Sequence, residues 1–177
     1  MKPNKIPVSV LVVIHTPDGQ VLLLERADRP GFWQSVTGSL DAPDEDTRLA
    51  AARELQEETG LSPVDGELFS TGIQNRYEIY AHWRHRYGPG VTHNTEHVFH
   101  FVMLAPRPVR LAPREHLGFA WLPWDQAAAR CFSPSNAEAI QVLAARHGWL
   151  TSDGKAVLVC APASASGSAS ALPREAS

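Results

Sequence analysis

Three glutamates, Glu54, Glu57 and Glu58, lie close together in the segment RELQEETGL. In a helix of about 3.6 residues per turn they would share an arc of roughly 100°. Their charges repel one another, and only Arg53 lies near enough to relieve the repulsion. Clustered carboxylates suit Mg²⁺, which prefers oxygen ligands and is usually held by one or two carboxylates together with substrate phosphates. The cluster therefore indicates either metal-assisted chemistry on a phosphate substrate or an ordinary solvent-exposed helix face.

The surrounding segment, DTRLAAARELQEETG, has the features of a helix that would present these glutamates. Asp46 or Thr47 is a suitable N-cap, the body is rich in alanine, and Gly60 is a typical C-terminal stop. Leu55 would point away from the glutamates and into a core. Upstream, Thr37 and Gly38 are predicted to form a tight turn that delivers the chain to this helix.

The other elements must form a sheet with helices packed on it. Apolar runs predict strands at residues 8–15, 20–26, 97–104 and 118–123, and the first two are predicted to form a hairpin around Pro17, Asp18 and Gly19. A further helix is predicted to start with a Ser135/Glu138 capping box and to end at Gly148. Continuous apolarity in the strands indicates burial on both faces, so the fold class is α/β or α+β.

Composition sets limits on organisation and partners. The chain has 177 residues and a net charge of −3, which fits one domain and offers no general attraction for nucleic acid or membrane. Cys131 and Cys160 form no disulfide framework, so a reducing cytoplasm fits, and the N-terminus has no signal-peptide cleavage pattern. Residues 1–158 are predicted to form the domain. Residues 159–177, rich in Ala and Ser, are predicted to be a disordered tail.

The region from Gly38 to Leu61 resembles the Nudix box, whose pattern is G-x5-E-x7-R-E-U-x-E-E-x-G-U with U apolar. The matching residues are Glu45, Arg53, Glu54, Leu55, Glu57, Glu58, Gly60 and Leu61. One difference is that six residues, rather than five, separate Gly38 from Glu45. The resemblance implies an α/β/α sandwich around a mixed sheet with a loop-helix-loop catalytic box. It also implies hydrolysis of a nucleoside diphosphate linked to some other moiety, by metal-assisted attack of water on a phosphorus.

Three further segments resemble the dihydroneopterin triphosphate diphosphatases, a branch of this family in folate biosynthesis. These segments are RHRYGPGVTHNTE, FWQSVTGS and EHLGFAWL, and the likeness runs from about residue 7 to residue 143. It implies a pyrophosphohydrolase that converts 7,8-dihydroneopterin triphosphate to dihydroneopterin monophosphate and pyrophosphate.

Residue roles follow from the same resemblance. It assigns metal binding to Glu54, Glu57, Glu58 and Glu115, and the catalytic base to Glu57 or Glu115. It assigns substrate contacts to Lys5, Arg26, Thr37, Tyr77, Glu78, Ile79, Tyr80 and Ser133.

Several assignments outside the box have a plainer alternative. Glu115 could be an ordinary loop carboxylate, and Arg26 could end its strand as a surface residue. Tyr77 and Tyr80 could be core or hairpin-face residues, and Ser133 could belong to the capping region of the last helix.

The expected cofactor is Mg²⁺, with Mn²⁺ as a substitute, and the expected partner is a small-molecule triphosphate without nucleic acid or membrane. The protein is expected to be cytoplasmic and a monomer or weak homodimer. Two other functions remain open at this stage. One is a MutT-like nucleoside triphosphate pyrophosphohydrolase, which needs the same box. The other is a non-catalytic nucleotide-sensing module, which would require a damaged box or an appended DNA-binding segment.

Overall fold

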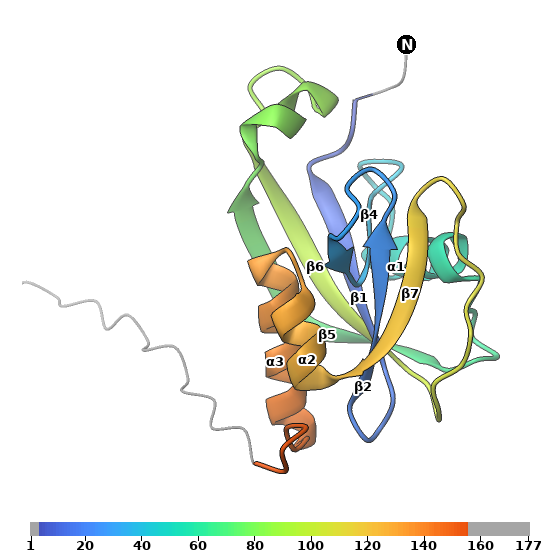
Figure 1. Cartoon of the computed structure of the whole chain (residues 1–177). Helices are drawn as coiled ribbons and strands as arrows, with labels where there is room; N and C mark the ends of the chain where they lie inside the picture. The colour runs from blue at the N-terminus through green and yellow to red at the C-terminus, as the bar shows by residue number, and fades with distance from the viewer. Residues whose placement is uncertain (1–3, 156–177) are drawn as a thin grey trace, which may run out of the picture.

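The computed structural model describes residues 4–155, which form one mixed sheet of seven strands with helices on both faces (Figure 1). The strands are β1 (Val8–His15), β2 (Gln20–Arg26), β3 (Trp33–Gln34), β4 (Val36–Ser39), β5 (Glu67–Glu78), β6 (His93–Val102) and β7 (His116–Pro123). The helices are α1 (Thr47–Thr59), α2 (Trp124–Arg130), α3 (Pro134–His147) and the 3₁₀ helix η1 (Ala81–Arg86). Strand β1 runs parallel to β6, and the other pairings are antiparallel.

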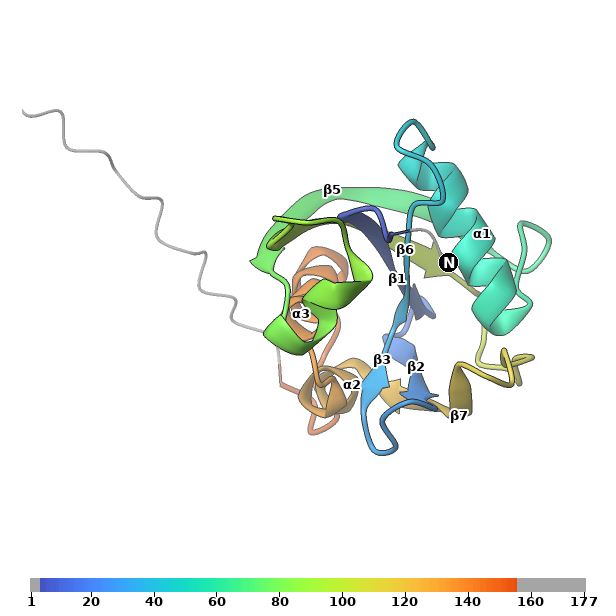
Figure 2. The same ribbon diagram turned by 90° about the horizontal axis from the view of Figure 1, so that it is seen from above.

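The central strand β1 explains the layered arrangement. Successive side chains of a strand point to opposite faces, and here both faces are apolar. Val10 and Val12 pack in the cluster that contains α1, whereas Leu11 and Val13 pack in the cluster that contains α2 and α3. Viewed from above, α1 lies on one side of the sheet and α2 and α3 on the other (Figure 2). The predicted α/β/α sandwich with a mixed sheet is confirmed.

One edge of β1 is shared by two strands. Near its end β1 pairs with β2, and along its first half it pairs with β4, where Leu11 faces Thr37 and Val10 faces Gly38. The hairpin predicted for the first two strands is therefore confirmed. The prediction that Thr37 and Gly38 form a tight turn is wrong, because both lie in β4. Gly38 leaves room for the Glu54 carboxylate in its present position, since a Cβ atom there would lie 1.9 Å from the carboxyl carbon of Glu54.

Helix α1 has the ends that the sequence predicts. The Asp46 side chain accepts hydrogen bonds from the backbone N–H groups of Arg48 and Leu49, and Gly60 ends the helix in the left-handed conformation with φ 71°. Leu55 is buried in the core. The cap at Asp46 fixes where the helix starts, and the start determines which glutamates face the sheet.

The start of α3 differs from the prediction. Its N-cap is Ser133, Pro134 occupies the first helical turn, and the Ser135/Glu138 capping box does not form. The Ser133 Oγ atom instead lies 3.0 Å from the Ser135 Oγ atom. The predicted stop at Gly148 is confirmed, with φ 65°.

Strand boundaries also shift, and several elements had no counterpart in the prediction. Strand β6 starts four residues before position 97 and β7 two residues before position 118. The elements missed were β3, β4, β5, α2 and η1. Strand β5 lies at the edge of the sheet and is largely exposed, so its sequence lacks an apolar pattern. The predicted tail at 159–177 lies outside the described residues. Among residues 4–155, no helix is long and apolar enough to cross a membrane.

Candidate active site

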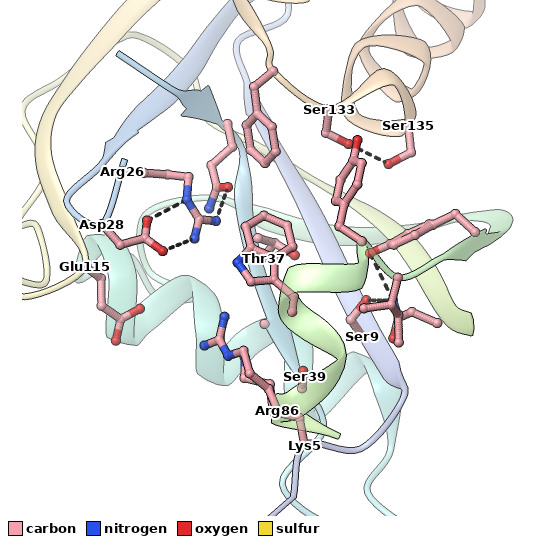
Figure 3. Close-up of a pocket in the computed structure, with 18 of the residues that line it drawn as sticks. Lys5, Ser9, Arg26, Asp28, Thr37, Ser39, Arg86, Glu115, Ser133 and Ser135 are labelled. Carbon is pink, nitrogen blue, oxygen red and sulfur yellow. Dashed lines mark hydrogen bonds and ion pairs between the residues drawn. The ribbon is translucent and has the colours of Figure 1, made fainter. Parts of the chain in front are cut away.

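A cavity of about 710 Å³ opens between the N-terminal segment, η1, the start of α3 and the loop before β7 (Figure 3). Its size is typical of a small-molecule site. The lining includes every residue predicted to contact substrate, together with two of the predicted carboxylates: Lys5, Arg26, Thr37, Tyr77, Glu78, Ile79, Tyr80 and Ser133, with Glu58 and Glu115. Glu54 and Glu57 are not among the lining residues. The fold therefore gathers residues from distant parts of the chain at one place.

Glu58 is the most buried carboxylate of the box, with a side chain only 3% exposed. Its Oε2 atom lies 3.1 Å from the Nε2 atom of His116, but this contact is not aligned as a hydrogen bond, and neither atom has another partner among the described residues. Burial raises the pKa of Glu58, and the nearby His116 opposes that effect. A buried oxygen without a hydrogen bond is costly, so this group needs a further partner.

Glu115 joins this pair from the loop before β7. One ligand atom each from Glu58, Glu115 and His116 lies within 4.8 Å of the others. The Glu115 carbonyl accepts a hydrogen bond from the Ala27 backbone N–H at 2.8 Å, which fixes the loop beside the end of β2. The cluster therefore unites the box helix with a carboxylate predicted from outside the box.

Arg53 organises the second part of the box. Its Nη1 atom donates to Glu54 Oε1 at 2.8 Å, its Nε atom donates to Glu45 Oε1 at 3.2 Å, and its Nη2 atom donates to the Ser39 carbonyl. The Glu45 carboxylate also accepts from the Asp41 backbone N–H at 2.6 Å. Despite the longer loop, Glu45 thus reaches Arg53 and ties the loop to the helix.

Glu57 differs from the other two box glutamates. Its side chain is 58% exposed, and its contact with Arg53 is the longer one, 3.5 Å. It lies outside the cluster of Glu58, Glu115 and His116. Its assignment as ligand or base stays a prediction.

The buried position of Glu54 has a consequence that can be measured. Burial raises the pKa of Glu54 from 4.5 to about 7, with Arg53 acting in the opposite direction. The folded protein therefore holds a proton between pH 4.5 and 7 that the unfolded chain releases, and ionisation of Glu54 destabilises the fold as the pH rises through this range.

We expect Glu54→Gln to match the wild type in stability near pH 4.5 and to exceed it above pH 7, by up to about 3 kcal/mol. Urea unfolding of both proteins in EDTA at several pH values measures this difference. Burial also lowers the pKa values of His15 and His100 to about 4. Their ionisation changes the stability of both proteins equally, so it does not contribute to the difference. A difference that does not change with pH would contradict the buried, protonated state of Glu54.

Cationic and aromatic groups line the opposite wall. Arg26 forms a two-point ion pair with Asp28, at 2.8 and 2.7 Å, and donates to Gln34 at 2.9 Å (Figure 3). Its guanidinium lies over the rings of Trp83 and Phe132, at 5.5 and 5.7 Å from their centres. Arg26 is thus held in a fixed orientation. Lys5, Arg86 and Arg114 add further positive charge to the lining.

The end of the cavity near β5 contains the predicted pterin contacts. The Asn94 amide donates to the hydroxyl of Tyr77 at 3.0 Å and to the hydroxyl of Ser9 at 2.7 Å. Glu78 pairs with Arg84, whose Nε atom also donates to the Ile79 carbonyl. This part of the wall combines aromatic faces with fixed polar groups.

Some residues of this site were missed in the sequence. Four lining residues lie outside the box: Asp28, Gln34, Asn94 and His116. Each of them is within two residues of a strand end or of a predicted site residue. The position of His116, next to Glu115 in the sequence, is the one signal that could have revealed it.

Comparison with known proteins agrees with this geometry. The family model described as NUDIX domain matches residues 5–143. The chain is 44% identical over 143 residues to the dihydroneopterin triphosphate diphosphatase of Escherichia coli K12, covering 79% of this chain and 93% of the relative. It is 41% identical over 138 residues to the enzyme of the same name from Haemophilus influenzae, covering 75% of this chain and 84% of that relative.

A solved structure supports the same relationship. The structure of the E. coli dihydroneopterin triphosphate pyrophosphohydrolase is similar to this fold, with a TM-score of 0.73 and 43% identity over 80% of this chain and 97% of that one. The match of the family model, the identity to these relatives and the shared fold lead to the same result. The chain belongs to the Nudix hydrolase family.

Proposed function

We propose that this protein hydrolyses 7,8-dihydroneopterin triphosphate to dihydroneopterin monophosphate and pyrophosphate. The 44% identity to one relative of this activity over 93% of its length, and the 41% identity to a second over 84% of its length, support the assignment. The observation that carries it is that the box residue Glu58 and every residue predicted to contact the substrate line one and the same cavity. We further propose that the protein acts in the cytoplasm as a monomer or weak homodimer.

The residues of the cavity fit a divalent cation with oxygen ligands. Glu58 has a buried oxygen without a hydrogen bond, and Glu115 lies beside it. Glu54 lies one helical turn away on α1. Burial disfavours its ionised form, so a nearby positive charge would stabilise the carboxylate. These three residues would hold Mg²⁺, with Mn²⁺ as a substitute. Bound there, the ion would supply charge neutralisation for the phosphates and would make a water molecule easier to deprotonate.

The protein's own groups have separate tasks in this proposal. Lys5, Arg26 and Arg86 bind the phosphate oxygens and keep the chain of phosphates extended across the cavity. The aromatic wall near Tyr77 and Tyr80 receives the flat ring, and backbone groups around Ile79 hydrogen-bond its edge.

The reaction uses one water molecule for each triphosphate. The water oxygen bonds to a phosphorus, the bridging P–O bond breaks, and pyrophosphate leaves with the electron pair of that bond. A carboxylate oxygen of Glu115 accepts the proton of the water. Glu115 is favoured over Glu57 for this task because it is among the residues that line the cavity, whereas Glu57 is not.

A product assay tests the reaction. Purified protein with dihydroneopterin triphosphate and Mg²⁺ should release pyrophosphate in a one-to-one ratio with dihydroneopterin monophosphate, and EDTA should stop the release. The same samples are assayed for inorganic phosphate with and without a pyrophosphatase. Stepwise release of phosphate in the absence of pyrophosphatase would contradict the proposed position of cleavage.

A further inference from the structure

Three histidines that no part of the proposed reaction uses meet at the other end of the sheet. His15 lies at the end of β1, His100 on β6 and His147 in the last turn of α3. One ring nitrogen of each lies within 4.8 Å of the others. Ser9, which lines the cavity, and His15 are six residues apart on β1, or about 20 Å. The histidine cluster is therefore separate from the proposed active site.

The hydrogen bonds of His15 fix its tautomer. Its Nδ1 atom lies 3.0 Å from the Thr16 carbonyl, which can only accept, so Nδ1 carries the proton. The lone pair therefore lies on Nε2, which accepts a hydrogen bond from His100 Nδ1–H at 2.9 Å. An ion bound between the two rings would replace this proton. A backbone carbonyl that holds the far nitrogen of an imidazole is the usual support of a histidine that binds metal.

The neighbouring rings hold the cluster in place. His15 and His100 stack with an interplanar angle of 8°, and His147 stacks on Trp149 with an angle of 12°. The Trp149 indole N–H donates to the Pro17 carbonyl at 2.9 Å, which attaches the residue after α3 to the turn after β1. Arg146, whose positive charge acts on His100, donates to the Thr71 carbonyl. The three imidazoles are thus positioned by parts of the fold that do not depend on an ion.

The protonation state of the cluster is compatible with ligation. Burial lowers the pKa of His15 and of His100 to about 4, so both rings are neutral at neutral pH. A histidine must be neutral to donate a lone pair to a metal.

We propose that His15, His100 and His147 bind a divalent transition-metal ion of the Zn²⁺ type, separate from the Mg²⁺ of the reaction. Ligand atoms on a tetrahedral ion with Zn–N bonds of about 2.0–2.1 Å lie about 3.4 Å apart. Binding therefore requires the His100 proton to move from Nδ1 to Nε2, and the facing nitrogens of His15 and His100, now 2.9 Å apart, to separate by about 0.5 Å while the rings turn toward the ion. Imidazole suits Zn²⁺, Co²⁺, Ni²⁺ and Cu²⁺, whereas Mg²⁺ requires oxygen ligands. His147 is exposed, which leaves the fourth position open to water. The ion would join the ends of β1, β6 and α3.

Titration with Co²⁺ tests the site, because tetrahedral Co²⁺ absorbs visible light strongly and octahedral Co²⁺ does so weakly. The protein must carry no histidine tag and must be saturated with Mg²⁺. We expect one equivalent of Co²⁺ to give the intense spectrum and Zn²⁺ to displace it. His147→Ala and His100→Ala should each weaken Zn²⁺ binding by at least about 100-fold, since even the loss of an outer partner costs 10–100-fold.

Matched variants separate this site from the active site. His93→Ala removes an exposed histidine from the same strand as His100 and should keep the spectrum. Hydrolysis by His147→Ala with Mg²⁺ should equal that of the wild type. Because His147 is exposed, this variant carries the test even where His100→Ala fails to fold. A missing intense spectrum, or one that persists in His147→Ala, would overturn the proposal. So would a spectrum that Glu58→Gln abolishes, since the ion would then occupy the carboxylates.

Discussion

Glu58→Gln is expected to lower turnover of dihydroneopterin triphosphate at saturating Mg²⁺ by at least about 100-fold while the fold stays intact. Removing even an outer partner of a metal ligand costs 10–100-fold, and Glu58 is proposed as a ligand itself. Glutamine keeps the volume of the side chain but loses the negative charge. Steady-state kinetics with a wide range of Mg²⁺ concentrations measures the effect.

The same substitution is expected to stabilise the metal-free protein. Burial raises the pKa of Glu58, so the ionised carboxylate is costly in its present surroundings, and a neutral amide avoids this cost. Thermal unfolding in EDTA should therefore give a melting temperature for Glu58→Gln that is equal to or above that of the wild type. Glu138→Gln, an exposed change on α3, serves as the matched control and should alter neither property. Turnover by Glu58→Gln within a few-fold of the wild type would exclude the proposed ligand role.

Gly38→Ala is expected to lower turnover by roughly 100-fold with little loss of stability. An added Cβ atom would lie 1.9 Å from the carboxyl carbon and 1.9 Å from the Oε1 atom of Glu54. These atoms are the far end of a flexible side chain, so the carboxylate can move away, and the free energy of unfolding should fall by less than about 2 kcal/mol. Displacing a group by about 1 Å in an active site can cost about 100-fold in rate.

Gly118→Ala is the control for Gly38→Ala. It also introduces a Cβ atom in a strand, but the nearest heavy atom there is Glu25 Oε2 at an ordinary 3.8 Å. Circular dichroism and urea unfolding should show both variants folded, and only Gly38→Ala should lose activity. If Gly38→Ala is as active as Gly118→Ala, the position of the Glu54 carboxylate has no part in the reaction.

The box helix could be predicted from the sequence because its signals are local. The cap at Asp46, the alanine-rich body, the stop at Gly60 and the buried Leu55 depend only on neighbours in the chain. The contacts of Arg53 with Glu54 and Glu45 lie within the same short segment, but they were seen only in the structure. Capping residues and an apolar face of this kind predict a helix whatever the rest of the fold is.

The unequal roles of the three glutamates required the tertiary structure. An arc on a helix shows which side chains share a face, but it does not show where the sheet meets that face. In the structure the sheet covers Glu54 and Glu58 and leaves Glu57 exposed. The position of His116 likewise depends on the pairing of β7 with β2, and the position of Asp28 depends on its ion pair with Arg26 at the end of β2. Strand β5 was missed because an edge strand needs few apolar residues.

The measurement that tests the central claim most directly is the ratio of kcat/KM for dihydroneopterin triphosphate to that for the common and oxidised nucleoside triphosphates. All substrates are measured with Mg²⁺, with Glu58→Gln as the background. The proposed pterin pocket predicts a clear preference for the pterin. A preference for a nucleotide would contradict the pterin assignment while leaving Nudix chemistry in place, and no turnover of any substrate above the Glu58→Gln background would contradict the catalytic role itself.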